Sequence, residues 1–385
     1  MGETSQDSKT RKSKPAKFHS YPFWSPRFWH AMRLGDWCKL VVENRFAIHP
    51  LRIPMAFLIS LVASFNSVMA LIQRIKYGRR IAEIQVSEPP VFIIGHWRSG
   101  TTFLHELMVL DERFTYPTTY QCFAPQHFLL TEWFFANYWG FLLPKQRPMD
   151  NVKTGWQRPQ EDEFALLAMG IRTPYRRMAF PNRPAPDQEY LNMQGVSAED
   201  LEVWKEGLGE FVRSLTLKES KRVILKSPTH TGRIETLSEM FPGAKFVHIT
   251  RHPYSLFPST RRLWHSLDSV QGLQLPRNER LDELVYDSFD RMYQGFDSQR
   301  NELPANTLYE LRYEDLVKDP VGKLEEIYRQ LQLGDFEPVR PTLEEYVDAQ
   351  KGYKTNRYEL EQELRLTLRQ RWATYFENYG YSDED

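Results

Sequence analysis

Two glycines frame a loop whose composition favours the binding of a phosphate or sulfate group. Gly95 and Gly100 are separated by four residues, and Thr101 and Thr102 follow the second glycine. Glycine allows a sharp turn that brings backbone amides toward an anion, and the N-terminus of a following helix adds partial positive charge. Thr101 stands where such loops in NTPases have lysine, so Arg98 brings the charge from inside the loop. A plain glycine turn between a strand and a helix is the alternative.

Two further cations occupy comparable places in the sequence. Lys226 and Arg251 each follow a short apolar segment directly, and Arg98 comes soon after another. Because the carboxyl ends of parallel strands meet at one edge of a sheet, we expect these side chains to gather there. Cations at one site favour an anionic ligand, and Arg98 and Lys226 would stabilise negative charge in a transition state. The alternative for Lys226 is an ordinary lysine at the end of a strand.

Short apolar runs that alternate with helical patterns define the expected fold. Residues 91–94, 222–225, 245–250 and 307–312 are typical of strands in a parallel sheet, and helical segments separate them. This alternation predicts an α/β fold with a doubly wound parallel sheet flanked by helices. No acidic residue ends the segment 245–250, so a Mg²⁺ ligand of the kind found in kinases and NTPases is not evident there.

Three motifs, in this order, resemble those of sulfotransferases that use 3′-phosphoadenosine 5′-phosphosulfate (PAPS). The run Arg98–Thr102 is similar to the loop that binds the 5′-phosphosulfate in that family. Arg251 followed by Ser259 resembles the pair that binds the 3′-phosphate, and Tyr313 resembles a tyrosine that contacts adenine. The resemblance covers about residues 91–333 and implies a P-loop-like form of the fold.

The resemblance also implies roles for individual residues. Those implied to bind the donor are Arg98, Ser99, Gly100, Thr101 and Thr102 at the 5′-phosphosulfate, Arg251 and Ser259 at the 3′-phosphate, and Phe103 and Tyr313 at the adenine. Lys226 matches a lysine that contacts the transferring sulfate in tyrosylprotein sulfotransferases. Lys354, in the basic loop 351–357, would close over the 3′-phosphate, although a solvated turn is an equal alternative. The donor substrate would be PAPS, and no metal is expected.

The base that takes the acceptor's proton has several candidates. Cytosolic sulfotransferases have a Lys-x-His pattern, but Pro228 stands at the histidine position here. His230 is the first candidate, because it lies one short turn beyond Lys226 and a neutral imidazole accepts a proton near neutral pH. Asp162 and Glu161, in an acidic cluster, are the next candidates. Such a cluster is also what the N-terminus of a helix favours.

An aromatic-rich insertion follows the first predicted βα unit. Residues 115–185 contain many Tyr, Phe and Trp residues, and we expect them to be helical. One interpretation is a hydrophobic cap packed on the sheet. The other is an acceptor pocket or a lid that faces a membrane, since apolar clefts are the usual sites for small molecules. The insertion favours an acceptor that is partly apolar, or a lipid or glycan at an interface.

The N-terminal part of the chain divides into a tail and a helical region. Residues 1–20 are polar and basic and predict a disordered tail, whereas residues 21–88 predict a helical region. Within the latter, residues 53–72 carry no charge and are long enough to span a membrane. Three interpretations stay open: a helix packed in the protein, a helix in the plane of a membrane, and a span. Basic residues at both ends favour surface contact over a span.

Composition restricts the remaining classes of function. The chain of 385 residues has 50 basic and 50 acidic residues, and this balance argues against a nucleic-acid-binding protein. Cys38 and Cys122 form no disulfide or metal-binding pattern, so we expect a cytoplasmic protein. The uncharged residues 53–72, with basic residues at both ends, would make it peripheral on a membrane. The pattern gives no oligomeric state. Residues 89–385 predict the catalytic domain.

The motifs together predict a sulfotransferase that transfers a sulfuryl group from PAPS to an acceptor hydroxyl or amine. A P-loop kinase-like enzyme is one alternative, and a preference for ATP with a requirement for Mg²⁺ would identify it. A membrane-associated scaffold that has lost catalysis is the other, and it would bind the nucleotide without turnover.

Overall fold

The apolar runs form the strands of one parallel sheet. In the computed structural model, which describes residues 21, 24–86, 88–144, 146, 154–350 and 360–383, the strands stand in the order β2–β3–β1–β4–β5. Their bounds are Val91–Ile94 for β1, Phe114–Thr115 for β2, Arg222–Lys226 for β3, Lys245–Thr250 for β4 and Leu308–Arg312 for β5. All pairings are parallel. The predicted α/β class is therefore confirmed, and β2 is a short strand that the sequence pattern did not indicate.

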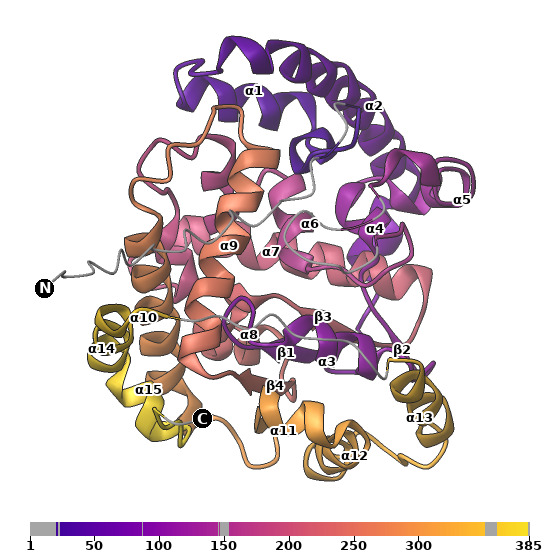
Figure 1. The fold of residues 1–385 in the computed structure, drawn as a ribbon. Coiled ribbons are helices and arrows are strands. Elements are labelled where there is room, and N and C mark those ends of the chain that lie inside the picture. Colours follow the sequence, from indigo (N-terminus) through magenta and orange to yellow (C-terminus); the bar gives the residue numbers. More distant parts are fainter. Residues whose placement is uncertain are drawn as a thin grey trace, which may run out of the picture.

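Helices connect the strands and cover both faces of the sheet (Figure 1). Within the described residues the α-helices are α1 (Leu34–Glu43), α2 (Ile53–Glu83), α3 (Thr101–Met108), α4 (Thr119–Phe123), α5 (Phe128–Tyr138), α6 (Asp162–Ala168), α7 (Ala198–Lys218), α8 (Ile234–Met240), α9 (Pro253–Gln271), α10 (Leu281–Gln299), α11 (Tyr313–Lys318), α12 (Pro320–Leu331), α13 (Arg340–Ala349), α14 (Gln362–Arg371) and α15 (Ala373–Asn378). The 3₁₀ helices are η1 (Phe28–Ala31), η2 (Pro50–Arg52), η3 (Gly140–Leu142), η4 (Pro174–Ala179), η5 (Gln188–Leu191), η6 (Pro228–Arg233) and η7 (Arg300–Glu302).

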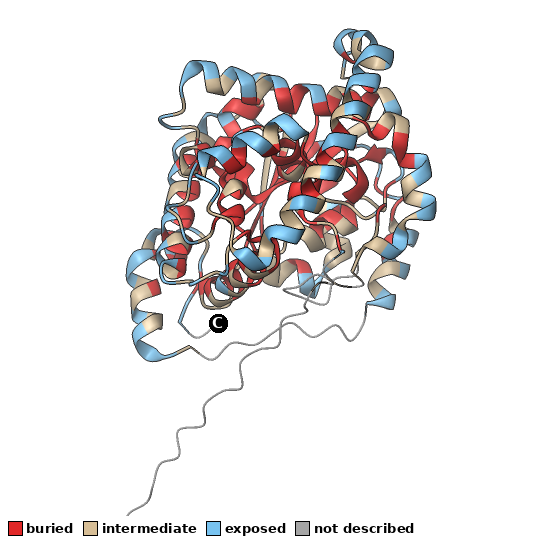
Figure 2. Ribbon diagram, turned by 90° about the horizontal axis from the view of Figure 1, so that it is seen from above, coloured by how far each residue is buried: buried red, intermediate tan, exposed pale blue. Residues whose placement is uncertain are grey.

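The sheet separates two hydrophobic clusters, because successive residues of a strand point to opposite faces. Phe92 and Phe246 face the larger cluster, to which the N-terminal helices, α6 to α10 and the C-terminal α14 and α15 contribute. Val91 and Val247 face the smaller cluster, which α3 and α11 to α13 cover. Figure 2 shows the buried residues gathered around the strands and the exposed residues on the outer helices.

The strand order brings together the three ends that carry the predicted cations. The chain passes from β3 to β4 across β1, so β1 lies between them. Ile93 of β1 is in register with Lys226 of β3 and with Val247 of β4. The loop that follows β1 therefore leaves the sheet between Lys226 and the residues that follow β4, which is the usual place for a ligand in such a sheet.

The insertion is helical, as predicted, and a buried ion pair fixes it to the sheet. Glu163, in the first turn of α6, accepts hydrogen bonds from Arg233 at 2.7 and 3.1 Å and from the hydroxyls of Thr173 and Thr229. Neither charged side chain has exposed surface. Burial acts to raise the pKa of Glu163, but Arg233 outweighs it and the pKa is lowered. The pair joins α6 to η6, the turn that follows β3.

We predict that Glu163→Gln lowers the free energy of unfolding by about 3–5 kcal/mol, because it leaves the guanidinium of Arg233 buried without a counter-charge. Urea unfolding at neutral pH measures the change. Glu83→Gln is the matched control: Glu83 forms an exposed ion pair with Arg79 on α2, and its loss should cost at most about 1 kcal/mol. Equal effects of the two substitutions would contradict a structural role for the buried pair.

Glu163→Gln also tests how the stability that Glu163 contributes depends on pH. Since the folded pKa of Glu163 lies below its ordinary value of 4.5, the stability that it contributes is present above pH 4.5 and is lost as the pH falls through the folded pKa. The difference between the wild type and Glu163→Gln should therefore shrink as unfolding is repeated at increasingly acidic pH. A difference that is the same at every pH would show that the charge of Glu163 is not what matters.

Candidate active site

The loop between β1 and α3 has the backbone shape that its glycines predicted. Gly95 and Gly100 have φ angles of 140° and 109°, which residues with side chains rarely adopt, and Arg98 has a φ of 71°. A Cβ atom at Gly95 would lie 2.3 Å from the carbonyl oxygen of Ile249, so a side chain does not fit there. Gly100 caps α3, and the free amides of the first helical turn face the loop. This arrangement is suited to bind an anion.

Four predicted donor residues from three distant motifs lie together beside this loop. Arg98 Nε donates a hydrogen bond to Ser259 Oγ at 3.0 Å, and the guanidinium of Arg251 donates to the carbonyl oxygen of Arg98 at 3.0 Å. Arg251 also lies over the ring of Tyr313, 4.6 Å from its centroid. A Cβ atom at Gly100 would come within 2.3 Å of that ring. The fold thus gathers these residues at the carboxyl end of the sheet.

The other predicted donor residues lie on the loop itself or on the start of α3. Ser99 is buried in the loop, and Thr101 and Thr102 form the first turn of the helix. Phe103 is half-buried and packs against the smaller hydrophobic cluster. Lys354 lies outside the described residues.

Lys226 contacts one of the candidate bases directly. Its Nζ donates to Glu161 Oε1 at 2.7 Å, and the hydroxyl of Tyr175 donates to Glu161 Oε2 at 2.6 Å. Trp97, which belongs to the donor loop, donates from Nε1 to the hydroxyl of Tyr175 at 2.7 Å. Burial, together with the nearby carboxylate of Glu161, raises the pKa of Tyr175 well above 10, so the tyrosine remains protonated and acts as a donor. Glu161 is therefore held through both oxygens and tied to the donor loop.

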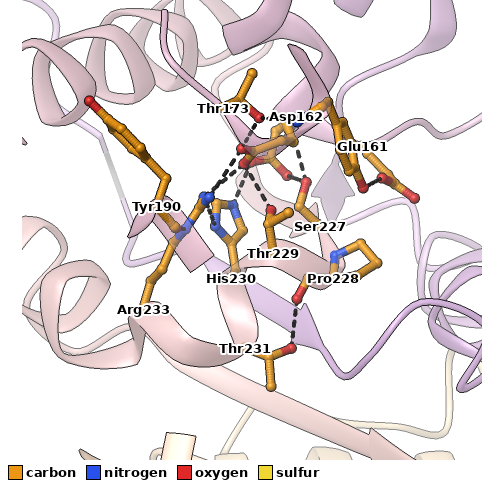
Figure 3. Close-up of polar contacts among 12 residues, drawn as sticks. Glu161, Asp162, Thr173, Tyr190, Ser227, Pro228, Thr229, His230, Thr231 and Arg233 are labelled. Carbon is orange, nitrogen blue, oxygen red and sulfur yellow. Dashed lines mark hydrogen bonds and ion pairs between the residues drawn. The ribbon is translucent and has the colours of Figure 1, made fainter. Parts of the chain in front are cut away.

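His230, the first candidate base in the sequence, points into the interior. It is fully buried, and its ring packs against Phe92 and Trp204 at centroid distances of 5.6 and 6.1 Å. Its Nε2 lies 2.6 Å from Asp162 Oδ2, and its Nδ1 lies 3.4 Å from a guanidinium nitrogen of Arg233. Figure 3 shows His230 and Asp162 turned toward each other, with Glu161 apart from this cluster.

Asp162 is as enclosed as its histidine partner. Its Oδ1 accepts a hydrogen bond from Ser227 Oγ at 2.9 Å, and the side chain has no exposed surface. Burial acts to raise the pKa of Asp162, but His230 and the hydrogen bonds outweigh it, so the pKa is lowered and the group is a carboxylate. The ranking of His230 ahead of Glu161 thus finds no support in the geometry, because Glu161 and not His230 lies at Lys226.

Sequence reasoning did not single out Tyr175, Trp97 or Arg233. Tyr175 on η4 reaches Glu161 at the start of α6 because the chain turns back between the two helices. No sequence motif encodes this contact. A weak signal was present for Trp97, since it lies inside the glycine loop. Arg233 comes three residues after His230 in a helical turn, which places both side chains on one face.

The arrangement combines an anion-binding loop, a buried ammonium group and a carboxylate. Such groups serve transfer of an anionic group to an acceptor whose proton the carboxylate removes. Among the described residues, no group of three or more His, Cys, Asp or Glu side chains lies close enough to hold a metal ion.

Two solved structures share the fold across most of the chain. The sulfotransferase STF9 from Mycobacterium avium aligns with a TM-score of 0.67 and 16% identity, covering 91% of this chain and 97% of that one. The sulfotransferase STF1 from Mycobacterium tuberculosis H37Rv aligns with a TM-score of 0.62 and 17% identity, covering 90% and 92%. At these identities the likeness concerns the fold, and it agrees with the P-loop-like sheet.

Two relatives are similar in sequence over nearly the whole chain. Proteins from Mycobacterium bovis and Mycobacterium tuberculosis, both named omega-hydroxy-beta-dihydromenaquinone-9 sulfotransferase Stf3, are 45% identical over 358 residues, which is 93% of this chain and 92% of each relative. The model of the sulfotransferase family matches residues 89–338. These findings decide against the kinase-like alternative and against the scaffold. The chain belongs to the sulfotransferase family and is an enzyme that transfers a sulfuryl group, with PAPS as the donor that the family implies.

Proposed function

We propose that this sulfotransferase acts on a hydroxyl group of a lipid, with Glu161 as the base and Lys226 as the cation at the transferring sulfate. One observation carries the proposal: Lys226 and Glu161 are in contact beside the anion-binding loop. Both are held by the fold, because Lys226 ends β3 and Glu161 also accepts a hydrogen bond from Tyr175.

The donor is bound by the loop and by the cluster next to it. The amides at the start of α3 and the run Arg98–Thr102 bind the 5′-phosphosulfate, and Arg251 and Ser259 bind the 3′-phosphate. The hydrogen bond between Arg98 and Ser259 supports this assignment, since it brings the two anion-binding motifs side by side. Phe103 and Tyr313 contact the adenine. Lys354 remains a proposed ligand of the 3′-phosphate.

Transfer needs one proton to move and one bond to exchange. Glu161 accepts the proton of the hydroxyl while the acceptor oxygen forms a bond to sulfur and the bond from sulfur to the phosphate oxygen breaks. The leaving group is adenosine 3′,5′-bisphosphate. Lys226 and Arg98 stabilise the negative charge that develops on the transferring and leaving oxygens. Tyr175 keeps Glu161 in orientation, because its hydroxyl donates to the oxygen that Lys226 does not bind.

His230 is the alternative base, and its surroundings support a different role. Because it is buried and contacts Asp162, it holds the segment after β3 against α6, and this segment begins at Lys226. His230 and Asp162 would then act on the rate only through the position of Lys226 and Glu161.

The relatives support a lipid acceptor. They are named for a hydroxylated menaquinone, a molecule with a long apolar chain, and they match this chain over 93% of its length. The half-buried rings of Phe28 and Phe164 lie near Glu161, since Phe164 packs against Tyr175 at a centroid distance of 4.9 Å. Apolar rings beside the base suit a hydroxyl at the end of an apolar chain.

We infer further that the protein is cytoplasmic and contacts a membrane surface through residues 53–72. By length and composition alone, Pro50–Glu83 could cross a membrane, and because only 22% of its most apolar window is buried, most of that window is not packed in a core. An exposed apolar helix of this kind, with basic residues at both ends, supports a position on a membrane rather than across it.

Donor binding gives the first test of the site. We expect adenosine 3′,5′-bisphosphate to bind more tightly than ATP without Mg²⁺, and Arg251→Ala to weaken its binding by about 1.5–3 kcal/mol. Calorimetric titration with adenosine 5′-phosphate should show little loss, because this ligand lacks the 3′-phosphate. Arg261→Ala, an exposed arginine on α9, is the control. An equal loss for both nucleotides would mean that Arg251 has a structural role.

Substitution separates Glu161 from His230 as the base. Glu161→Gln should lower kcat by about 10²–10⁴-fold, the usual loss for a general base, and leave the affinity for adenosine 3′,5′-bisphosphate nearly unchanged. His230→Gln should lower the melting temperature and have a much smaller effect on the kcat of the folded enzyme. If Glu161→Gln keeps nearly wild-type turnover and folded His230→Gln shows the large loss of kcat instead, His230 is the base.

The acceptor class is tested by turnover. With PAPS as the donor, we expect mass spectrometry to detect the sulfate ester of a lipid that carries a hydroxyl at the end of a long apolar chain. Its KM should be lower than that of a short alcohol, since the longer chain buries more apolar surface. Turnover only with small polar acceptors would contradict the proposed lipid class.

A further inference from the structure

Helix α2 buries two amide side chains and leaves most of its large apolar side chains between Ile53 and Ile75 exposed. Asn66 is buried and donates to the carbonyl oxygens of His30 and Met32 at 2.7 and 3.0 Å, and Gln73 is buried and accepts from the amide of Leu129 at 2.9 Å. The exposed side chains of this helix include Ile53, Phe57, Leu61, Phe65, Val68, Leu71, Ile72 and Ile75. A surface helix of a soluble protein has the opposite distribution.

The inner contacts of α2 decide how it can meet a membrane. Besides Asn66 and Gln73, Ser60 accepts a hydrogen bond from Trp37 Nε1 at 2.9 Å, and Ser67 accepts one from the amide of Leu34. These bonds join residues 60–73 of the helix to η1, α1 and α5. A helix held in this way cannot cross a bilayer unless it leaves the domain, whereas its outer face is free to lie on one.

The exposed face continues from α2 onto α5 and η3. Trp133, Phe134 and Tyr138 on α5 and Phe141 on η3 are exposed, with 72% of the surface of Trp133 accessible. The ring of Phe65 on α2 lies 6.1 Å from that of Phe135 on α5, and Figure 1 shows the two helices side by side. We call the outer side of α2 together with these four aromatic residues the apolar face. An exposed apolar area of this extent marks an interaction surface.

Charge indicates what lies against the apolar face. Between Glu43 and Glu83 the chain has no acidic residue, but it has the basic residues Arg45, Arg52, Arg74, Lys76, Arg79 and Arg80. All of these except the partly exposed Arg52 are exposed. Arg45 and Arg52 precede α2, and the other four lie in its C-terminal third. Basic residues around an apolar strip match an anionic lipid surface, with apolar side chains among the acyl chains and cations at the headgroups.

A row of rings connects the apolar face to the active site. From Phe135 on α5 the contacts run through Tyr120 and Trp156 to Phe123, at centroid distances of 5.8, 5.6 and 6.2 Å. Phe123 then contacts Phe28 at 5.6 Å.

The last part of the row reaches the base. Phe28 stacks on Phe164 at 4.0 Å, and Phe164 packs against Tyr175, which donates to Glu161. Phe123, Phe28 and Phe164 are only half-buried.

We propose that the apolar face docks on an anionic bilayer, and that the lipid acceptor passes from that bilayer to Glu161 along Phe123, Phe28 and Phe164. The second half rests on the proposed lipid acceptor, whereas the first does not. Docking places the entrance of the site at the lipid surface. The acceptor's apolar chain then stays in apolar surroundings while its hydroxyl reaches the base.

Vesicle sedimentation tests the docking without any acceptor. The wild-type enzyme should bind vesicles of phosphatidylglycerol and phosphatidylcholine, and bind pure phosphatidylcholine more weakly. Phe57→Glu and Trp133→Glu should each weaken binding to the anionic vesicles about tenfold or more, because each places a charge where an aromatic ring inserts. Leu366→Glu on α14 is the matched control, since Leu366 and Phe57 are equally exposed at 64% and 65%. It should bind like the wild type.

Several outcomes would overturn the docking. One is that the wild type does not bind vesicles, and another is that both variants bind them like the wild type. A third is that only detergent, and not a high-pH wash, releases the protein from membranes, which would indicate a span. A lipid-free dimer that Phe57→Glu dissociates would assign the face to a second copy of the chain.

The route is tested with the acceptor presented in two forms. Phe28→Ala and Phe164→Ala should raise the KM for a long-chain hydroxylated lipid in vesicles about tenfold and change the KM for a short soluble alcohol little. Phe57→Glu should slow turnover of the vesicle-bound lipid alone. Equal effects on both acceptors would overturn the route. If no lipid is sulfated but sedimentation behaves as described, the proposed acceptor is wrong and the docking face stands.

Discussion

The active site depends on a single match between two short segments. Residues 161–163 are three consecutive carboxylates, and each contacts one basic residue of the segment 226–233, which runs from the end of β3 through η6: Lys226, His230 and Arg233, in that order. Two of the pairs are fully buried. A buried charge without its partner is costly, so a shift of the insertion by one residue along β3 would leave several charges unpaired. The pairing thereby fixes where Glu161 lies, although Glu161 itself points toward the donor side.

The positions of the predicted donor residues could be foreseen because the geometry of their loop is local. A strand that ends in a glycine loop and continues into a helix imposes its own shape, and the positive φ angles of Gly95 and Gly100 follow from it. Parallel strands then bring Arg98, Lys226 and Arg251 to one edge whatever the connections between them are. The acceptor half has no such rule. Its contacts join residues far apart in the sequence through an irregular insertion, so the motif could name candidates but not say which way they point.

His230 illustrates this limit. The sequence placed it correctly on the turn after Lys226, but the direction of its ring depends on Asp162 and Arg233, which the motif does not include. The acidic cluster was open to the interpretation of a helix N-terminus, and Glu161 does precede the first turn of α6. The acidic cluster can both begin a helix and supply the base, because consecutive residues at the start of a helix point toward different sides. For α2, likewise, composition left three placements open, and the inward direction of Asn66 and Gln73 supports the one that we propose, a helix on a membrane surface.

The N-terminal helices pack against the domain that carries the candidate site. The main chain of Phe28 donates to the side chain of Gln271 at the end of α9, and its ring stacks on Phe164. Two residues further on, the carbonyl oxygen of His30 accepts a hydrogen bond from Asn66 of α2. One short segment thus contacts both the membrane-docking helix that we propose and the wall next to Glu161. Under the proposal of a lipid acceptor, the site has to lie at a fixed depth below the bilayer surface. Helix α2 packs on η1 and η1 packs on α6, and this packing would hold that depth where a flexible linker would not.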